Sequence, residues 1–250
     1  MPWRSLATFL LLLGAVGSSF FATPVLAAER FTILTEELPP FSYTEQGKIA
    51  GMNVEIVRAV LKRLDHPDTI AVNIWSRAYN LTLSHKGHGL FSTIRTPERE
   101  SLFKWVGPLQ GDKTVFFARK GSGITLRTLD DARRVKSIGV YKDDMSEEFL
   151  LQNGFTNLDS VLDDSMNVRK LASGRIDLWC TGLASGLMIA RRLGLSDRIE
   201  EALVLVNDPF YIAFNRQTPD EEVARWQAAL DAVKKSGEFD EIMAKYGYRE

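Results

Sequence analysis

Residues 91–100 have the sequence FSTIRTPERE and mark the end of a strand followed by the first turn of a helix. Thr96 is a favourable N-cap, and Pro97 suits the first helical position because an N–H there would be unsatisfied anyway. The helix start then offers free backbone N–H groups beside Arg99, with Arg95 just before the turn. This combination favours a small anion such as a carboxylate, although an ordinary capped helix with solvated arginines explains the segment equally well.

The first 28 residues predict a secretory signal peptide. Arg4 supplies a positive charge, an apolar run extends from residue 6 to about residue 22, and residues 25–27 fit the small-residue cleavage rule. Cleavage after Ala28 is nearly as favourable as cleavage after Ala27. An uncleaved membrane anchor is the alternative, but glycines and serines interrupt the run and it is short for a span.

The cysteine count and the net charge limit the cellular compartments and the kinds of partner that are expected. Cys180 is the only cysteine, so the signal offers no site for a lipid anchor and the chain can form no internal disulfide. We therefore predict a released periplasmic protein, in which Cys180 is a small core residue. Removing residues 1–28 takes away one arginine and no acid, so the net charge of −1 becomes −2. This balance gives no indication of a nucleic-acid partner.

Strands alternate with helices along the mature chain, which predicts parallel α/β units. The predicted strands are residues 31–35, 69–74, 89–94, 114–118, 135–141, 176–180, 202–206 and 210–214. The predicted helices are residues 53–64, 76–86, 126–132, 145–152, 163–171, 184–193, 219–235 and 239–246.

These elements form two units, at about residues 30–110 and 114–205, and the segments after residue 208 need the first unit to pack on. We predict one lobe from residues 29–111 and 208–250, a second lobe from residues 112–207, and two crossings that act as a hinge with a cleft between the lobes. Ligands of open α/β sheets bind at the carboxyl ends of strands, where Ser92 and Thr93 lie.

Five segments together resemble family 3 of the bacterial extracellular solute-binding proteins, the polar amino-acid-binding components of ABC importers. They are the first cleft loop at residues 37–43, the helix start at 51–57, the turn at 95–100, the strand at 174–178 and the closing helix at 242–247. The resemblance covers residues 30–247 and implies a two-lobe, type II periplasmic-binding-protein-like α/β fold. It also implies a small-molecule ligand, an amino acid or related carboxylate, and an inner-membrane ABC permease as partner; we expect a monomer.

The resemblance also implies roles for site residues. Arg99 takes the position of the arginine that pairs with the ligand α-carboxylate through its planar fork. Ser92 and Thr93 supply hydroxyl or backbone contacts, Phe41 or Tyr43 covers the ligand, and Trp75 is a second wall or else an ordinary core residue.

Two departures from the family pattern concern the other end of the ligand. Asp143 and Asp144 follow the strand of the second lobe where the family has a small-residue pair. Asp144 is either a plain helix cap or a partner for a ligand amine. The family's amine-binding acid is absent from residues 180–185, and Glu36, Glu37 or Asp144 can substitute for it.

Three functions fit these observations. The first is a solute receptor that closes on its ligand and needs no chemistry, cofactor or metal. The second is an enzyme on the same fold, resembling the cyclohexadienyl dehydratases, with a cleft carboxylate as general acid. The third is a stand-alone sensor. The three histidines have no metal-ligand or triad spacing, so we expect no enzyme.

Overall fold

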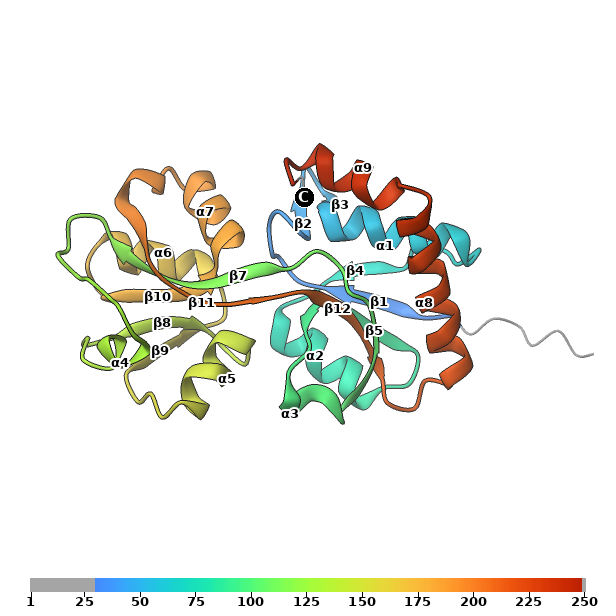
Figure 1. Ribbon diagram of the computed structural model, residues 1–250, viewed down its shortest axis with the longest axis horizontal. Coiled ribbons are helices and arrows are strands. Elements are labelled where there is room, and N and C mark those ends of the chain that lie inside the picture. Colours follow the sequence, from blue (N-terminus) through green and yellow to red (C-terminus); the bar gives the residue numbers. More distant parts are fainter. Residues whose placement is uncertain (1–29, 249–250) are drawn as a thin grey trace, which may run out of the picture.

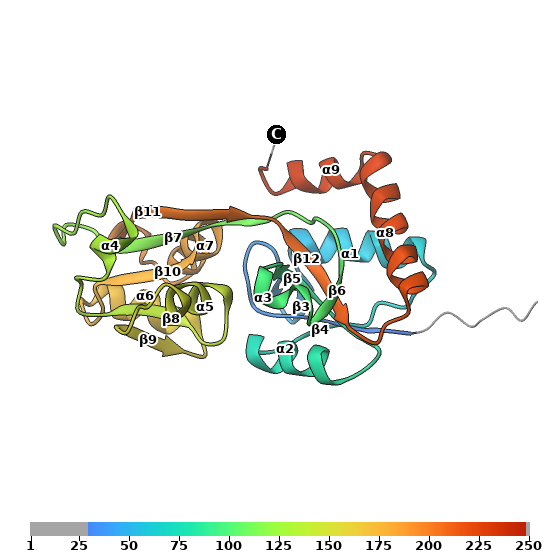
Figure 2. The ribbon, with the colours of Figure 1, turned by 60° about the horizontal axis from the view of Figure 1, so that its bottom comes forward.

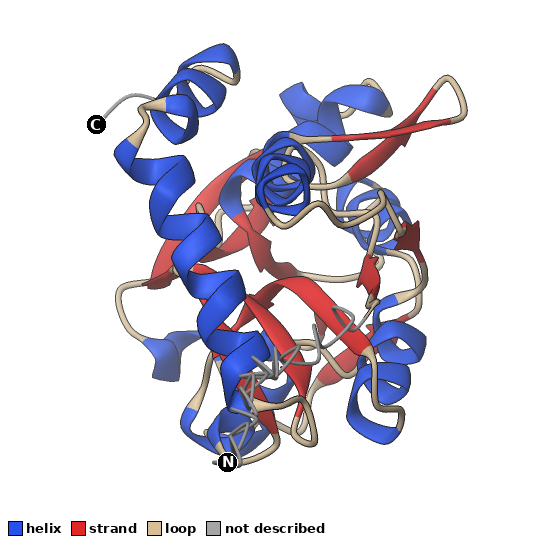
Figure 3. Ribbon diagram, turned by 90° about the vertical axis from the view of Figure 1, so that its right-hand side faces the viewer, coloured by secondary structure: helices blue, strands red, loops and turns tan. Residues whose placement is uncertain are grey.

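The computed structural model describes residues 30–248 and contains two α/β bodies side by side along the long axis of the molecule (Figure 1). Each body has a five-stranded sheet. Viewed end-on, strands lie at the centre of the first body and helices surround them (Figure 3). The predicted signal peptide, residues 1–28, lies outside the described residues.

The first sheet has the order β4-β1-β5-β12-β6. Its strands are β1 (Thr32–Thr35), β4 (Ile70–Val72), β5 (His88–Ile94), β6 (Phe103–Val106) and β12 (Phe210–Asn215). β1 is parallel to β4 and β5, whereas β12 is antiparallel to β5 and β6. The late strand β12 therefore lies inside the sheet made by the start of the chain.

Helices cover both faces of this sheet. One face carries α1 (Met52–Arg63), α8 (Asp220–Lys235) and α9 (Glu238–Lys245), and its core includes Phe31, Phe214 and Trp226 in edge-to-face contact. The other face carries α2 (Trp75–Ser84), whose Trp75 and Ala78 pack on β1 and β5. A short hairpin, β2 (Tyr43–Glu45) and β3 (Lys48–Ala50), precedes α1, and α3 (Pro97–Glu100) follows β5.

The second sheet has the order β11-β7-β10-β8-β9. Its strands are β7 (Asp112–Arg119), β8 (Ile138–Tyr141), β9 (Leu158–Val161), β10 (Leu178–Gly182) and β11 (Ile199–Asp208). Its helices are α4 (Leu129–Ala132), α5 (Met145–Gln152), α6 (Asp164–Ala172), α7 (Leu183–Arg192) and the 3-10 turn Ser196–Arg198.

Successive side chains of β7 point to opposite faces of the sheet, so the core of the second body has two layers. Phe116 packs on one face of the sheet with Leu150 of α5, whereas Val115 and Phe117 pack on the other with α6 and α7. Cys180 is fully buried in β10, as the sequence predicts.

The chain passes between the bodies twice, and the two connecting segments lie side by side. β7 and β11 run antiparallel, with Asp112 opposite Asp208 (Figures 1 and 2). A Cβ atom on Gly111 would lie 2.0 Å from the carbonyl oxygen of Asp208, so the close approach of the two crossings requires glycine there.

Each predicted strand and helix has a counterpart, with ends shifted by a few residues. The prediction missed four short strands, β2, β3, β6 and β9. α2 begins at Trp75, one residue before the predicted start at residue 76, and Tyr141 from the second body accepts the hydrogen bond of the Trp75 N–H at 3.2 Å. Within residues 30–248, every helix is too short or too polar to cross a membrane.

Candidate functional site

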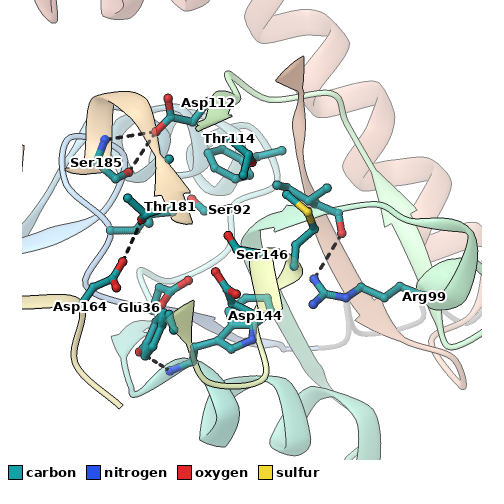
Figure 4. Close-up of a pocket in the computed structure, with 17 residues that line it drawn as sticks. Glu36, Ser92, Arg99, Asp112, Thr114, Asp144, Ser146, Asp164, Thr181 and Ser185 are labelled. Carbon is teal, nitrogen blue, oxygen red and sulfur yellow. Dashed lines mark hydrogen bonds between the residues drawn. The ribbon is translucent and has the colours of Figure 1, made fainter. Parts of the chain in front are cut away.

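A cavity lies between the two bodies, and we call it the inner chamber (Figure 4). Its wall consists of Glu36, Leu38, Trp75, Ser92, Ile94, Arg99, Asp112, Thr114, Tyr141, Asp144, Met145, Ser146, Asp164, Thr181, Gly182, Ser185 and Phe210. Both sheets present strand ends or the loops that follow them to this chamber, which is the expected ligand position in open α/β folds.

Ser92 occupies the chamber wall in a strained backbone conformation. Its φ angle is 60°, a value uncommon for residues other than glycine and typical of strain held at a functional position. The side-chain amide of Asn53, at the start of α1, donates to Ser92 Oγ at 3.1 Å and to the Gln110 carbonyl at 3.1 Å. Asn53 therefore ties the end of β5 to the crossing between the bodies.

Arg99 is positioned by the predicted helix start. Thr96 caps α3 by accepting from the Arg99 N–H at 3.4 Å, and Pro97 fills the first helical position. The guanidinium is almost fully buried and reaches Glu148 of α5, with Nε and Nη2 at 3.0 and 2.9 Å from Oε2. It also lies over the rings of Trp75 and Tyr79. Arg99 thus forms an ion pair with one carboxylate oxygen of the second body, while its Nη2 atom makes no hydrogen bond of good geometry with the described residues.

Glu36 follows β1 directly and is 5% exposed. Its Oε2 atom has no hydrogen-bond partner among the described residues. Burial raises the pKa of this carboxyl well above its usual value, and the nearby carboxyls of Asp144 and Asp164 raise it further. Figure 4 shows the carboxyl groups of Glu36 and Asp144 turned toward the same space.

Asp144 caps α5, and its Oδ1 accepts from the Glu147 N–H at 2.9 Å. Burial raises the pKa of Asp144 to about 7, and the charge of Asp164 adds to the shift, while the Glu147 N–H opposes it. Asp164 accepts hydrogen bonds from Trp179 Nε1 at 2.9 Å and Thr181 Oγ1 at 2.8 Å, yet burial still raises its pKa. The chamber therefore contains acids that resist losing their protons.

Asp112 is the first residue of β7, and its side chain caps the start of α7. Its carboxylate accepts from the backbone N–H groups of Ala184 and Ser185 at 3.0 and 3.1 Å. A Cβ atom on Gly182 would lie 2.3 Å from Asp112 Oδ2. The sequence after β10 lacks an acid, and the fold brings one to this place from a neighbouring strand.

Trp75 connects the two bodies beside the chamber. Its indole Nε1 donates to the Asp143 carbonyl oxygen at 2.6 Å, in addition to the bond from its backbone N–H to Tyr141. Tyr141 in turn packs among the apolar residues under α2. Burial raises the pKa of the Tyr141 hydroxyl well above its usual value, so it stays protonated.

A second, larger cavity of about 570 Å³ adjoins the inner chamber, and we call it the outer chamber. It is lined by Glu37, Leu38, Pro39, Val72, Asn73, Ile74, Tyr141, Leu162, Asp163, Asp164, Ser165, Ile189, Arg192 and Leu193. Leu38, Tyr141 and Asp164 belong to both walls. The two chambers therefore meet at these three residues.

Four of the predicted site residues come together on the inner chamber: Arg99, Ser92, Trp75 and Asp144. The other four do not line it. Glu37 reaches the outer chamber instead, where both carboxylate oxygens accept from the Thr44 N–H at 3.0 Å.

The remaining three predicted residues have structural surroundings. Phe41 is fully buried in the core of the first body against Phe210, with ring centroids 5.1 Å apart, so it is no cover for the chamber. Thr93 Oγ1 donates to the Leu90 carbonyl on its own strand. Arg95 pairs with Glu100 through two hydrogen bonds of 2.6 and 2.5 Å and lies over the rings of Trp105 and Tyr211.

Sequence reasoning missed Asp112, Tyr141 and Asp164 as wall residues. Asp112 sits immediately after the predicted crossing at Gly111, which is a signal that was available. Asp164 is separated from Thr181 by a helix, and only the packing of α6 beside β10 brings the two together. Within residues 30–248, no three or more His, Cys, Asp or Glu side chains are grouped so as to hold a metal ion.

Two α/β bodies joined by two crossings, with charged residues from both in one chamber, define a two-lobed solute-binding protein of the type II periplasmic-binding-protein fold. The model of the bacterial extracellular solute-binding proteins, family 3, matches residues 32–249, and the chain belongs to this family.

Solved structures show the same fold at low sequence identity. A histidine kinase sensor domain with similarity to periplasmic binding proteins has a TM-score of 0.80 and 23% identity, covering 87% of this chain and 96% of its own. The arginine-, lysine-, histidine-binding protein ArtJ from Geobacillus stearothermophilus has a TM-score of 0.77 and 19% identity. The match covers 88% of this chain and 97% of ArtJ. The ancestral amino acid-binding protein AncCDT-1, a precursor of cyclohexadienyl dehydratase, has a TM-score of 0.73 and 17% identity. The match covers 87% of this chain and 94% of AncCDT-1. No curated protein matches the chain.

Proposed function

We propose that this protein is a periplasmic solute receptor that closes on a small polar ligand and delivers it to an inner-membrane ABC permease. The observation that carries the proposal is the inner chamber itself, whose charged and polar wall residues come from both bodies. A ligand in contact with both halves favours the closed arrangement, because only that arrangement offers all of its contacts at once.

The proposed lobes are residues 29–111 with 208–250, and residues 112–207. β7 and β11 start and end at the two adjacent crossings, so a small backbone rotation there changes the distance between the lobes. Contacts between the lobes in this structure include the Arg99–Glu148 ion pair, the two hydrogen bonds of Trp75 and the Arg192 guanidinium over the Tyr43 ring.

The support for an amino-acid-like ligand comes from the relatives. ArtJ is named as a protein that binds arginine, lysine and histidine, and an ancestral arginine-binding protein was solved with arginine and with glutamine. Periplasmic location rests on the family together with the predicted signal peptide.

A thermal-shift screen of the purified mature protein against the standard amino acids tests the receptor function. A bound ligand at a hundredfold excess over its dissociation constant stabilises the folded state by about 2.7 kcal/mol, so a true ligand raises the unfolding temperature in a saturable way. A flat response to amino acids and amines alike would overturn the proposal.

An enzyme is the second candidate, because acids that keep their protons near neutral pH are suited to general acid catalysis. Asp144, with its pKa raised to about 7, is the residue that favours it. Turnover of prephenate or arogenate by the wild-type protein, lost in Asp144→Asn, would establish this candidate instead of the receptor. The third candidate is a stand-alone sensor, on the fold shared with the kinase sensor domain.

A further inference from the structure

We propose that the two chambers select a primary amine with a hydrocarbon body, the ammonium group in the inner chamber and the hydrocarbon in the outer one. This inference rests on the proposed receptor function and names its ligand class. The recognition it describes needs no carboxylate on the ligand.

The charges on the inner wall favour a cation. Four acidic residues line it, Glu36, Asp112, Asp144 and Asp164, against one cation among the described lining residues, Arg99. Arg99 is already paired with the charge of Glu148, although its Nη2 atom makes no hydrogen bond of good geometry with the described residues. An incoming carboxylate would face the four acids and would share Arg99 with Glu148, whereas an ammonium group favours the ionised form of each acid and so opposes the rise in the pKa values of Glu36, Asp144 and Asp164.

The acids differ in what they have left to offer a ligand. Asp112 accepts from two backbone N–H groups of α7, and Asp164 accepts from the side chains of Trp179 and Thr181. Glu36, by contrast, is nine-tenths buried or more, lines the chamber and leaves Oε2 without a partner. A buried acceptor without a donor is costly in the free protein, and a ligand N–H removes that cost. Glu36 is therefore the principal partner of the ammonium group, with Asp144 beside it.

The outer chamber accounts for the rest of the ligand. Half of its wall is apolar, with Leu38, Val72 and Ile74 from one body and Leu162, Ile189 and Leu193 from the other. The charged residues on this wall are Glu37, Asp163, Asp164 and Arg192. Ile74 and Leu162 are 51% and 53% exposed, although both are large hydrophobic side chains. Hydrocarbon seated between them would be removed from water together with their own surfaces.

Calorimetric titration with three compounds of equal chain length tests this inference: hexylamine, hexan-1-ol and hexanoate. We expect hexylamine to bind at least tenfold more tightly than either of the others. In Glu36→Gln, which keeps the shape and removes the charge, hexylamine affinity should fall at least tenfold. Glu45→Gln makes the same change at an exposed residue outside both chambers and should bind like the wild type.

The outcomes separate the two proposals. Hexanoate binding as tightly as hexylamine, or amino acids binding while hexylamine does not, overturns the amine inference and leaves the receptor function standing. Failure of every amine and every amino acid to bind overturns both. The comparison of the three compounds on the wild-type protein decides the question even if Glu36→Gln does not fold.

Discussion

At the scale of single residues, Arg99 and Glu148 form an asymmetric ion pair between the two bodies, beside the chamber. The side chain of Arg99 is 2% exposed and that of Glu148 is 32% exposed. Removing one partner of such a pair leaves the other charge without compensation, and the cost depends on how far that charge is from water. The two truncations of this pair therefore differ in their consequences.

We predict that Glu148→Gln lowers the free energy of unfolding by about 2–4 kcal/mol, because it leaves the buried guanidinium without a counter-charge. Arg99→Met should cost less, since the stranded carboxylate of Glu148 reaches solvent and the methionine still packs on the rings of Trp75 and Tyr79. Urea denaturation of both variants measures the difference.

The control for this pair is Asp130→Asn, which breaks the exposed ion pair with Arg133 on α4. A surface pair contributes about 0–1 kcal/mol, so this change should be small. Equal losses in all three variants would contradict the assignment of Arg99 as a buried charge held by Glu148.

At the scale of elements, helix starts determine where the charged groups of the chamber lie. Thr96 and Asp144 cap α3 and α5 as the sequence predicts, because a cap needs only its own side chain and the next turn. The start of α7 is different, since Gly182 has no side chain and the acceptor comes from Asp112 of another strand.

We predict that Asp112→Ala lowers the free energy of unfolding by about 1–2 kcal/mol, the usual cost of losing a helix cap. Asp112→Asn keeps a carbonyl acceptor and should recover part of the loss. Hydrogen exchange of the Ala184 and Ser185 amides locates the effect: faster exchange confined to the start of α7 is expected in the alanine variant. Unchanged protection of these amides would show that the cap contributes nothing.

At the scale of the whole molecule, the two bodies bring together acids that are far apart in the sequence. Glu36 comes from the first body, while Asp144 and Asp164 come from the second. The polar and charged groups beside them include the Tyr141 hydroxyl, the Ser146 hydroxyl, Arg99 and Asp163. Because burial and the charge of a nearby carboxylate raise the pKa of each of these three carboxyls, the folded state binds more protons than the unfolded state above the ordinary carboxyl pKa.

Stability should therefore fall as pH rises from about 5 to about 8. The unfolded chain loses these protons near its ordinary carboxyl pKa values, and the folded protein loses that of Asp144 only at about 7. We expect the free energy of unfolding to decrease by about 1–3 kcal/mol across this window. Carboxylates whose pKa is lowered, such as Asp131, titrate below this pH window and do not contribute to the decline.

Urea denaturation at pH 5, 6, 7 and 8 measures this decline. The double variant Glu36→Gln, Asp144→Asn should flatten it and should be more stable than the wild type at pH 8, because the amides carry no buried charge. The same variant should lose affinity for hexylamine. Stability that rises with pH in the wild-type protein would contradict the predicted effect of the acid cluster.

The sequence alone predicted the fold, the order of the longer strands and helices, and the capped turn that holds Arg99, but not the short strands β2, β3, β6 and β9. These features depend on hydrophobic period, on turn residues and on contacts within a few positions, all of which are local. It did not exclude Phe41, Thr93, Arg95 and Glu37 from the inner chamber, since each looks equally available in the sequence. The packed structure shows that Phe41 lies in a core, that Arg95 pairs with Glu100 and that Glu148 reaches Arg99. The chamber forms where two separately folded sheets meet, so its charge depends on residue pairs whose sequence separation carries no signal.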